Sequence, residues 1–268
     1  MTSRKRNESE LLFEEYLTGH GFAGWTHEPI IEGKRKRPDY KLEYDGSVLF
    51  FEIKEFDAPC RGLRSGHSDL YGPIREKMNQ STRQFKEYKE FSCSVVLANP
   101  KSAFVHLGDP WTIIGAMLGN VAFKVQVGVN PDVVHPLEQI FTRSGKMIDY
   151  KHRQPQNTTV SSIIVLGTYP LRRNEIRAAI KVRQQALGRM TTLDEDLEFY
   201  EVMPETPDLR QVRVSVYENP FARIPLRRNL FNGPFDQRWG VDGKFIRRVY
   251  FGSEAARFEE SLGERGHG

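Results

Sequence analysis

Cysteine is scarce in this sequence: the 268 residues include only Cys60 and Cys93. Two isolated cysteines form neither a disulfide framework nor a metal-spaced pair, and such usage is typical of a reducing compartment. Long apolar runs are also missing, because none approaches the roughly 20 residues that a bilayer crossing needs. The basic start of the chain is not followed by an apolar stretch, so we expect no secretory signal. These absences predict a cytoplasmic protein that does not enter a membrane.

Other absences narrow the function and the domain organisation. The sequence has no phosphate-binding motif of the form GxxxxGKS/T, which excludes an ATP-driven motor of that class. It has no internal repeat, no low-complexity linker and no break in composition. The formal net charge is only +4, which permits a polyanionic partner without requiring one. We expect one domain over residues 1–268, with a core at 7–190, an extension at 191–252 and a tail at 253–268.

The hydrophobic pattern predicts a mixed α/β core. The expected elements, in chain order, are a helix at 9–22 capped by Asn7 or Ser9, strands at 25–31, 39–44 and 47–56, a helix at 74–91 and a strand at 92–100. A strand–helix–strand crossover in this order creates at least one parallel pair. Beyond residue 100 the pattern predicts a short helix at 109–120, strands at 121–129, 158–169 and 209–220, and a basic helix at 171–190.

Two of the predicted strands bring acidic residues close to each other. Asp45-Gly46 between them is a strong signal for a two-residue turn, so these strands are expected to pair antiparallel. Counting outward from the turn places Asp39 and Glu52 within about one register step. Lys54 lies two residues beyond Glu52 and therefore points to the same face of the strand. Because an apolar run leads directly into Glu52, we expect this group of charges at the edge of the core.

Two neighbouring carboxylates repel each other, and the pKa of one rises unless a positive charge lies near them. Mg²⁺ or Mn²⁺ would resolve this, because Mg²⁺ uses one or two carboxylates and keeps several waters. Asp39 and Glu52 are the expected metal ligands, together with the backbone carbonyl of Ile53. A bound cation polarises a phosphoryl oxygen and lowers the pKa of a water molecule. Lys54 would then orient that water or stabilise the charge that develops on the phosphorane.

Pro38-Asp39 followed by Glu52-Ile53-Lys54 resembles the signature of the PD-(D/E)XK nucleases, and the resemblance covers residues 7–98. It implies a restriction-endonuclease-like core, a mixed central sheet flanked by helices, here with an elaborated C-terminal half. It also implies a metal-dependent nuclease that acts on nucleic acid, DNA more than RNA, in defence or repair. Many relatives are dimers, which implies a homodimer or a partner in a defence or repair complex. The family cuts single or double strands, internally or from an end, so these choices stay open.

The resemblance extends to the two helices that flank the predicted strands. In the family an acid on the first helix often completes the metal site, and Glu10 or Glu14 matches it here. Many members carry a glutamine, and some a tyrosine four residues later, on the second helix. Gln84 and Tyr88 match that pattern. The resemblance therefore implies roles for these four residues in binding metal or nucleic acid.

Basic residues near the predicted site are candidates for contacts with the phosphate backbone. The expected nucleic-acid-binding set is Lys34, Arg35, Lys36, Arg37, Lys77, Gln84 and Tyr88. Arg61, Arg64 and His67, in the Gly- and Pro-rich segment 58–73, are further candidates for contact with the cut strand. Basic residues of the helix at 171–190 and of the loop at 223–228 are candidates to line a groove.

Each of these features also has a simpler interpretation. Asp39 could end a strand, and Glu52 and Lys54 could form an exposed ion pair worth roughly 0.2–1 kcal/mol. Acids and glutamines on helices routinely face solvent, and charge runs are usually solvated surfaces. The alternative function is a non-catalytic nucleic-acid- or protein-binding module that retains the nuclease fold. The apolar run before Glu52 and the paired acid on the neighbouring strand argue against a simple ion pair. The intact set of two acids and a lysine argues against the non-catalytic module.

Overall fold

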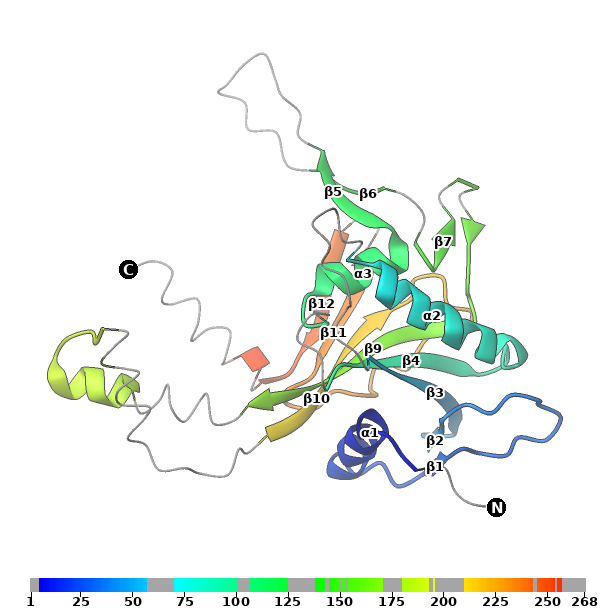
Figure 1. Ribbon diagram of the computed structural model, residues 1–268, viewed down its shortest axis with the longest axis horizontal. Coiled ribbons are helices and arrows are strands. Elements are labelled where there is room, and N and C mark those ends of the chain that lie inside the picture. Colours follow the sequence, from blue (N-terminus) through cyan, green and yellow to red (C-terminus); the bar gives the residue numbers. More distant parts are fainter. Residues whose placement is uncertain are drawn as a thin grey trace, which may run out of the picture.

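The computed structural model of the chain describes residues 5–56, 70–100, 107–124, 138–142, 145–149, 151–152, 154–170, 180–192, 195, 210–242, 245–253 and 255–256. It shows a mixed α/β structure in which helices cover both faces of one large sheet (Figure 1). The flanking helices are α1 (Glu8–Gly19), α2 (Gly72–Gln84) and α3 (Pro110–Leu118), with a 3-10 turn, η1 (Phe85–Glu87), after α2. The predicted mixed sheet flanked by helices is confirmed at this level.

Eight strands of the described chain form the sheet, in the order β1-β2-β3-β4-β9-β10-β11-β12. They are β1 (Trp25–His27), β2 (Tyr40–Tyr44), β3 (Ser47–Glu55), β4 (Ser92–Ala98), β9 (Val160–Pro170), β10 (Arg210–Glu218), β11 (Gln237–Asp242) and β12 (Phe245–Phe251). β3–β4, β4–β9 and β10–β11 pair in parallel, and the other neighbours are antiparallel. The crossover through α2 therefore gives the parallel pair that the sequence predicts.

Several elements differ from the sequence expectations. The second helix ends at Gln84, and its expected last part is the 3-10 turn η1 and a short loop. β11 and β12 were not expected. In β11 the buried positions are Arg238 and Gly240, whereas the apolar Trp239 and Val241 are only half-buried, so the strand lacks an apolar buried face. Two small sheets follow α3. They consist of β5 (Asn120–Lys124) with β6 (Glu138–Thr142), and of β7 (Ile148–Asp149) with β8 (Gln154–Pro155).

A tight hairpin between β2 and β3 fixes the register of the site strands. Tyr44 pairs with Ser47, and the two residues between them, Asp45 and Gly46, have φ angles of 48° and 69°. Positive φ at both positions is the mark of a type I′ turn, which glycine and aspartate adopt readily. The ladder ends with Tyr40 opposite Phe51. Continued by one residue, the same register sets residue 39 opposite residue 52, as the sequence predicts.

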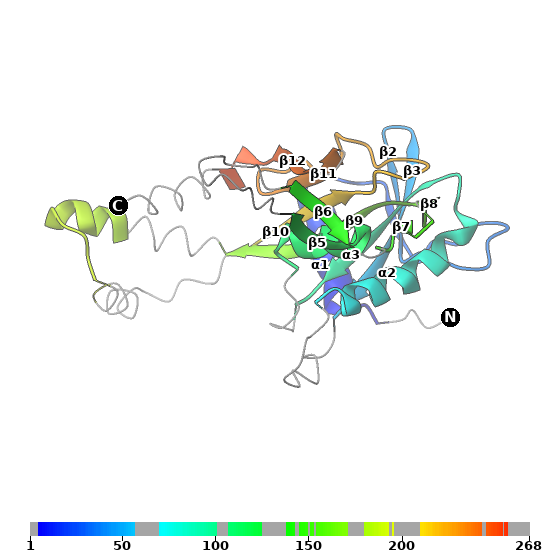
Figure 2. The ribbon, with the colours of Figure 1, turned by 90° about the horizontal axis from the view of Figure 1, so that it is seen from above.

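The two faces of the sheet carry separate apolar cores. Leu49, Phe51 and Ile53 of β3 pack with buried residues of α1. Phe50 of β3, and Phe56 just after the strand, point to the other face. They pack with α2 and α3, the layer that faces the viewer in Figure 2. Because side chains alternate along a strand, position along β3 decides which helix each charged residue meets.

Asp236 ties the C-terminal strands to α1. Its carboxylate is fully buried and accepts hydrogen bonds from Tyr16 Oη (2.5 Å), Gly233 N (2.6 Å) and Val214 N (2.9 Å). Three donors satisfy a buried carboxylate that would otherwise be costly. The segment that precedes β11 is thereby fixed against the first helix of the chain.

Replacing Asp236 with alanine should destabilise the fold by about 3 kcal/mol or more, because two buried backbone N–H groups and one hydroxyl lose their acceptor. Tyr16→Phe removes one donor and should cost about 1 kcal/mol. Urea unfolding followed by circular dichroism measures both free energies. A smaller loss for Asp236→Ala than for Tyr16→Phe would contradict the anchoring role.

Candidate active site

Glu52 is a buried carboxylate on β3 that faces α2, with 1% of its surface exposed. Its Oε1 accepts hydrogen bonds from Lys54 Nζ (2.6 Å) and from Gln84 Nε2 (2.9 Å). Its Oε2 is also buried and has no hydrogen-bond partner within the described part of the chain. A buried polar atom without a partner carries a desolvation cost. The Oε2 atom is therefore placed where a cation would stabilise it.

The environment of Glu52 favours its protonated form. The pKa of Glu52 is raised to about 7, chiefly by burial and also by the negative charge of Asp39. The ammonium group of Lys54 and the amide of Gln84 act in the opposite direction, through charge and hydrogen bonding. A second positive charge beside Oε2 would shift this balance toward the ionised carboxylate.

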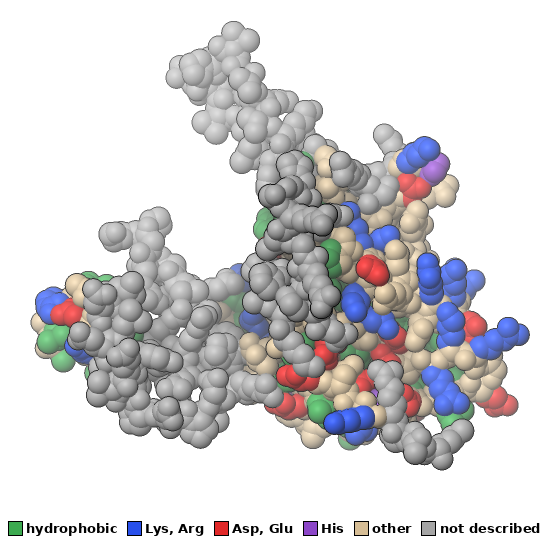
Figure 3. Space-filling model, viewed as in Figure 1, with side chains coloured by type: hydrophobic (Ala, Val, Ile, Leu, Met, Phe, Trp, Pro, Cys, Tyr) green, Lys and Arg blue, Asp and Glu red, His purple; other side chains and the backbone are tan. Residues whose placement is uncertain are grey.

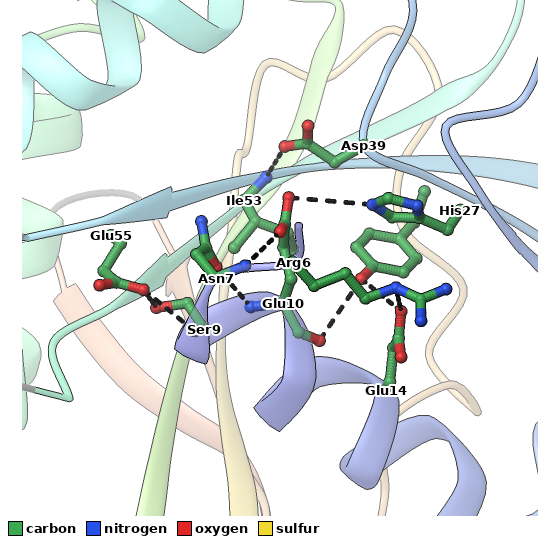
Figure 4. A network of polar contacts seen from close by, with 10 residues as sticks. Arg6, Asn7, Ser9, Glu10, Glu14, His27, Asp39, Ile53 and Glu55 are labelled. Atoms are coloured by element: carbon green, nitrogen blue, oxygen red, sulfur yellow. Dashed lines mark hydrogen bonds and ion pairs between the residues drawn. The ribbon is translucent and has the colours of Figure 1, made fainter. Parts of the chain in front are cut away.

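Asp39 lies just before β2, next to Glu52 in the continued register. Its Oδ2 accepts a hydrogen bond from Ile53 N (2.7 Å), and its backbone carbonyl accepts one from Glu28 N (2.7 Å). The N–H and C=O groups of one strand residue point toward the same neighbouring strand. The Ile53 carbonyl is therefore directed to the same side as the Asp39 carboxylate, beyond the last pair of the β2–β3 ladder (Figure 4).

Polar groups of β3 and α2 complete this cluster. Lys54 has 21% of its side chain exposed, so its ammonium group reaches both Glu52 and solvent. Lys77 of α2 lies on the same face, with Nζ 5.8 Å from the centre of the Phe56 ring. The structure therefore gathers Asp39, Glu52, Lys54 and Gln84 around one edge of the sheet.

Glu10 lies on α1, on the face of the sheet opposite to Glu52. Asn7, not Ser9, is the N-cap of this helix, and Glu10 closes the capping box by accepting a hydrogen bond from Asn7 N (2.7 Å). Its other oxygen, Oε1, lies 3.9 Å from His27 Nε2 (Figure 4). The geometry explains Glu10 as part of the helix cap.

Glu14 lies one turn farther along the same face of α1. Its Oε1 accepts a hydrogen bond from Tyr40 Oη (2.8 Å) and pairs with Arg6 Nε (2.7 Å). These contacts hold the carboxylate between α1 and β2, away from the α2 face. The expectation that Glu10 or Glu14 completes a metal site with Glu52 thus gains no support from the arrangement of the two faces.

The lysines that precede Asp39 have local partners. Lys34 Nζ donates to the carbonyl of Glu87 and to the carboxylate of Glu90, and Lys36 Nζ donates to the carbonyl of Arg83 (2.9 Å). These carbonyls belong to the last turn of α2 and to η1. Ammonium groups in that position cap the end of a helix and complement its dipole. Both lysines therefore attach the segment before Asp39 to the end of α2, so their ammonium groups already have partners within the protein.

Arg35 and Arg37, which alternate with these lysines, are exposed. Tyr88 is fully buried, and its hydroxyl donates to the carbonyl of Lys36. Tyr88 therefore holds this segment in place and presents no surface to nucleic acid. Lys and Arg side chains gather over the part of the surface where α2 lies (Figure 3). Of the further basic candidates, Arg61, Arg64, His67, Arg172, Arg173 and Arg177 lie outside the described residues.

Glu28 supports Asp39, and His27 lies beside it on the α1 face, and sequence reasoning selected neither residue. Glu28 holds the carbonyl of Asp39 and has a positive φ of 46°. His27 is opposite Tyr40 in the ladder, and its Nε2 is buried without a hydrogen-bond partner among the described residues. The available signal was their position at the end of the strand that pairs with β2. A lone histidine in a strand did not by itself indicate chemistry.

The cluster provides a small set of oxygen ligands. In the part of the chain that the structure describes, no three His, Cys, Asp or Glu side chains form a group that could hold a metal ion. Mg²⁺ does not require such a group, because it is commonly bound by one or two carboxylates and keeps its waters. Asp39, Glu52 and the Ile53 carbonyl fit that requirement, and the partnerless Oε2 of Glu52 supports it.

Replacing Glu52 with glutamine should change the pH dependence of stability in metal-free buffer. The folded-state pKa of about 7 lies above the ordinary 4.5, so the folded state binds this proton more tightly. The resulting stabilisation is complete below pH 4.5 and is lost as the pH rises through 7, by about 3 kcal/mol at 1.36 kcal/mol per pH unit. Urea unfolding at pH 5 and pH 8 measures this loss, which should disappear in Glu52→Gln.

Glu55→Gln is the matched control for this measurement. Glu55 is a buried carboxylate of the same strand, but it faces α1 and accepts hydrogen bonds from the backbone and hydroxyl of Ser9 (3.0 and 2.7 Å). This control separates the specific effect of Glu52 on the pH dependence of stability from the effect of removing any buried carboxylate. Parallel stability curves for the wild type and Glu52→Gln would contradict the raised pKa.

No family model, curated protein or solved structure matches the chain. No helix of the described residues combines the length and apolar character that crossing a membrane requires. The chemistry of the site is therefore inferred from its own residues.

Proposed function

We propose that this chain is a metal-dependent nuclease that hydrolyses phosphodiester bonds at Asp39, Glu52 and Lys54. The observation that carries the proposal is the buried Glu52 carboxylate. One of its oxygens is held by Lys54 and Gln84, and the other has no hydrogen-bond partner among the described residues. With the negative charge of Asp39 beside it, this arrangement suits a divalent cation, Mg²⁺ or Mn²⁺.

Each residue of the cluster has a distinct role. Asp39, Glu52 and the Ile53 carbonyl would hold the cation, which when bound polarises a phosphoryl oxygen and acidifies water. Lys54 Nζ is fixed by Glu52 and still reaches solvent, so it orients the attacking water and stabilises negative charge on the phosphorane. Gln84 keeps the Glu52 carboxylate oriented through its hydrogen bond.

Nucleic acid is the substrate that the surroundings support. Arg35 and Arg37 are exposed immediately before Asp39, and Lys77 lies on the α2 face of the site. Cationic groups around a cluster of this kind contact phosphates and make binding dependent on salt. The resemblance to the PD-(D/E)XK signature supports DNA over RNA, a role in defence or repair, and a restriction-endonuclease-like core within the observed sheet.

Lys54→Ala should lower the cleavage rate by about 100-fold or more, the usual contribution of a group that manages a proton or developing charge. Folding and nucleic-acid binding should change little, because the lysine is partly exposed. The assay is incubation of plasmid, linear duplex, single-stranded DNA and structured RNA with Mg²⁺ or Mn²⁺, and with a chelator that should stop the reaction.

Lys41→Ala is the control for this substitution. Lys41 lies on the neighbouring strand β2, is similarly exposed, and pairs with Glu43 at 2.5 Å. It removes an equivalent ion pair outside the site and should leave cleavage unchanged. Cleavage by Lys54→Ala at the wild-type rate would rule out this mechanism. A wild type that cuts none of the four substrates would favour the non-catalytic binding module.

Metal binding can be tested separately from cleavage. Asp39→Asn and Glu52→Gln should each weaken Mn²⁺ binding by at least about tenfold, because even supporting groups around a metal contribute 10- to 100-fold. Glu55→Gln, on the opposite face of β3, should retain the wild-type affinity. Titration calorimetry measures the three variants, and an equal loss in all of them would locate the cation elsewhere.

A further inference from the structure

A cavity of about 290 Å³ lies on the α1 face of the sheet, outside the site described above. It is bordered by the C-terminal end of α1, the end of β2 and the segment 229–233. Five rings line it, those of Tyr16, His20, Phe22, Tyr44 and Phe231. Its volume is at the lower limit for small-molecule sites, which suits one heterocyclic ring system more than an extended ligand.

The rings form a continuous aromatic wall. Tyr16 and His20 are stacked, with centroids 4.1 Å apart and an interplanar angle of 28°. Phe22 contacts Tyr44 (5.5 Å) and Phe231 (5.7 Å) edge to face. Tyr16 and Phe231 are fully buried, so a base would stack on the half-buried rings of His20, Phe22 and Tyr44. One stacked base changes affinity by about 5- to 100-fold.

Two amide residues lie at the rim of the same cavity. Asn229 and Asn232 line it and are exposed, whereas Glu43, which also borders it, pairs its carboxylate with Lys41. Amide groups offer both donors and acceptors, which match the edges of a base whose pairing partner has been removed. The cavity therefore combines a stacking surface with groups that read a base edge.

The wall is held in a strained conformation. Phe231 has a φ of 61°, which is unusual for a bulky residue and persists only where surrounding contacts impose it. The buried Arg238 donates to the carbonyl of Leu230 (2.5 Å), and Asp236 accepts from Gly233 N (2.6 Å). These bonds fix Leu230 and Gly233, which lie on either side of Phe231 in the segment 229–233. The cavity is therefore formed before any ligand binds.

The charge beside the cavity distinguishes between possible ligands. Arg227 and Arg228 directly precede Asn229. Arg227 pairs with Asp45, and Arg228 is exposed. A positive charge here attracts a phosphate and repels a quaternary ammonium group. A nucleotide fits this charge.

We propose that this cavity receives one unstacked base of the nucleic acid that the active site cuts, with Arg228 on an adjoining phosphate. This inference rests on the proposed nuclease function. Asp39 and Glu43 are at opposite ends of β2, about 13 Å apart along the strand. Because the cavity and Glu52 lie on opposite faces of the sheet, that distance is a lower limit, which corresponds to at least about four nucleotides at 3.4 Å each. A paired base cannot enter, so the substrate carries a single-stranded or unpaired segment near the cut.

Ala23 allows the cavity to be filled without removing a contact. Ala23 is exposed and lines the cavity, so Ala23→Trp places an indole where the base would lie. The matched control is Thr18→Trp, at an exposed position of α1 that does not line it. Binding of a labelled single-stranded oligonucleotide is measured in chelator, where no cutting occurs. Ala23→Trp should weaken binding by about 5- to 100-fold, and Thr18→Trp should not.

Asn229→Asp provides a second variant, at an exposed residue. It is used if thermal unfolding shows that Ala23→Trp is not folded. Its negative charge at the rim should also weaken binding. Unchanged oligonucleotide affinity in the folded variants overturns the inference, whatever the cleavage assay gives. If Ala23→Trp weakens oligonucleotide binding but the wild type cuts no substrate, the base site is supported and the nuclease function is rejected. Binding of a trimethyl-lysine peptide, lost in Ala23→Trp while oligonucleotide affinity is unchanged, overturns it in favour of a cation site.

Discussion

The alternation of side chains along β3 is the constraint on which the candidate site depends. Ile53 and Glu55 point to α1, whereas Glu52 and Lys54 point to α2. The two-residue turn at 45–46 decides which residues of β3 take each face, because it fixes the register of β3 against β2. A slip of one residue would exchange the faces and bury the site charges against α1. A short turn thus determines where the acids and the lysine meet.

Keeping Glu52 in the core has an energetic cost. A carboxylate with a raised pKa and a partnerless oxygen is a less stable choice than an apolar residue of similar size. Groups with strongly shifted pKa values that are clustered near a sheet edge are typical of functional sites. The capping box of α1 and the Glu14 contacts show no such cost, because their oxygens have ordinary partners.

Much of the N-terminal half was predictable from local signals. The apolar period of α1, the Asp45-Gly46 turn and the apolar β3 and β4 each agree with the fold they form. Gln84 was selected only through the family resemblance, as a nucleic-acid-binding residue, and its hydrogen bond to Glu52 was not expected. These features depend on short spacings, which a single sequence records well.

Other features depend on contacts between distant segments and could not be inferred from spacing. Glu10 and Glu14 lie on the face of the sheet that α1 covers, whereas Glu52 lies on the α2 face, and a helical period alone does not choose a face of the sheet. Lys34 and Lys36 cap α2 because that helix ends beside them, 47 to 53 residues later in the sequence. β11 was hidden because its buried positions are Arg238 and Gly240, so its polar pattern resembles a loop.

The bond between Tyr16 and Asp236 joins residues 220 positions apart. During synthesis the first helix leaves the ribosome long before its buried hydroxyl can find that acceptor, and its apolar face must also wait for β9 and β10. Contacts of such long range form late and leave hydrophobic surface exposed in the meantime. Residues up to Asp236 must therefore be made before the Tyr16 hydroxyl gains its acceptor and α1 gains its last buried contacts.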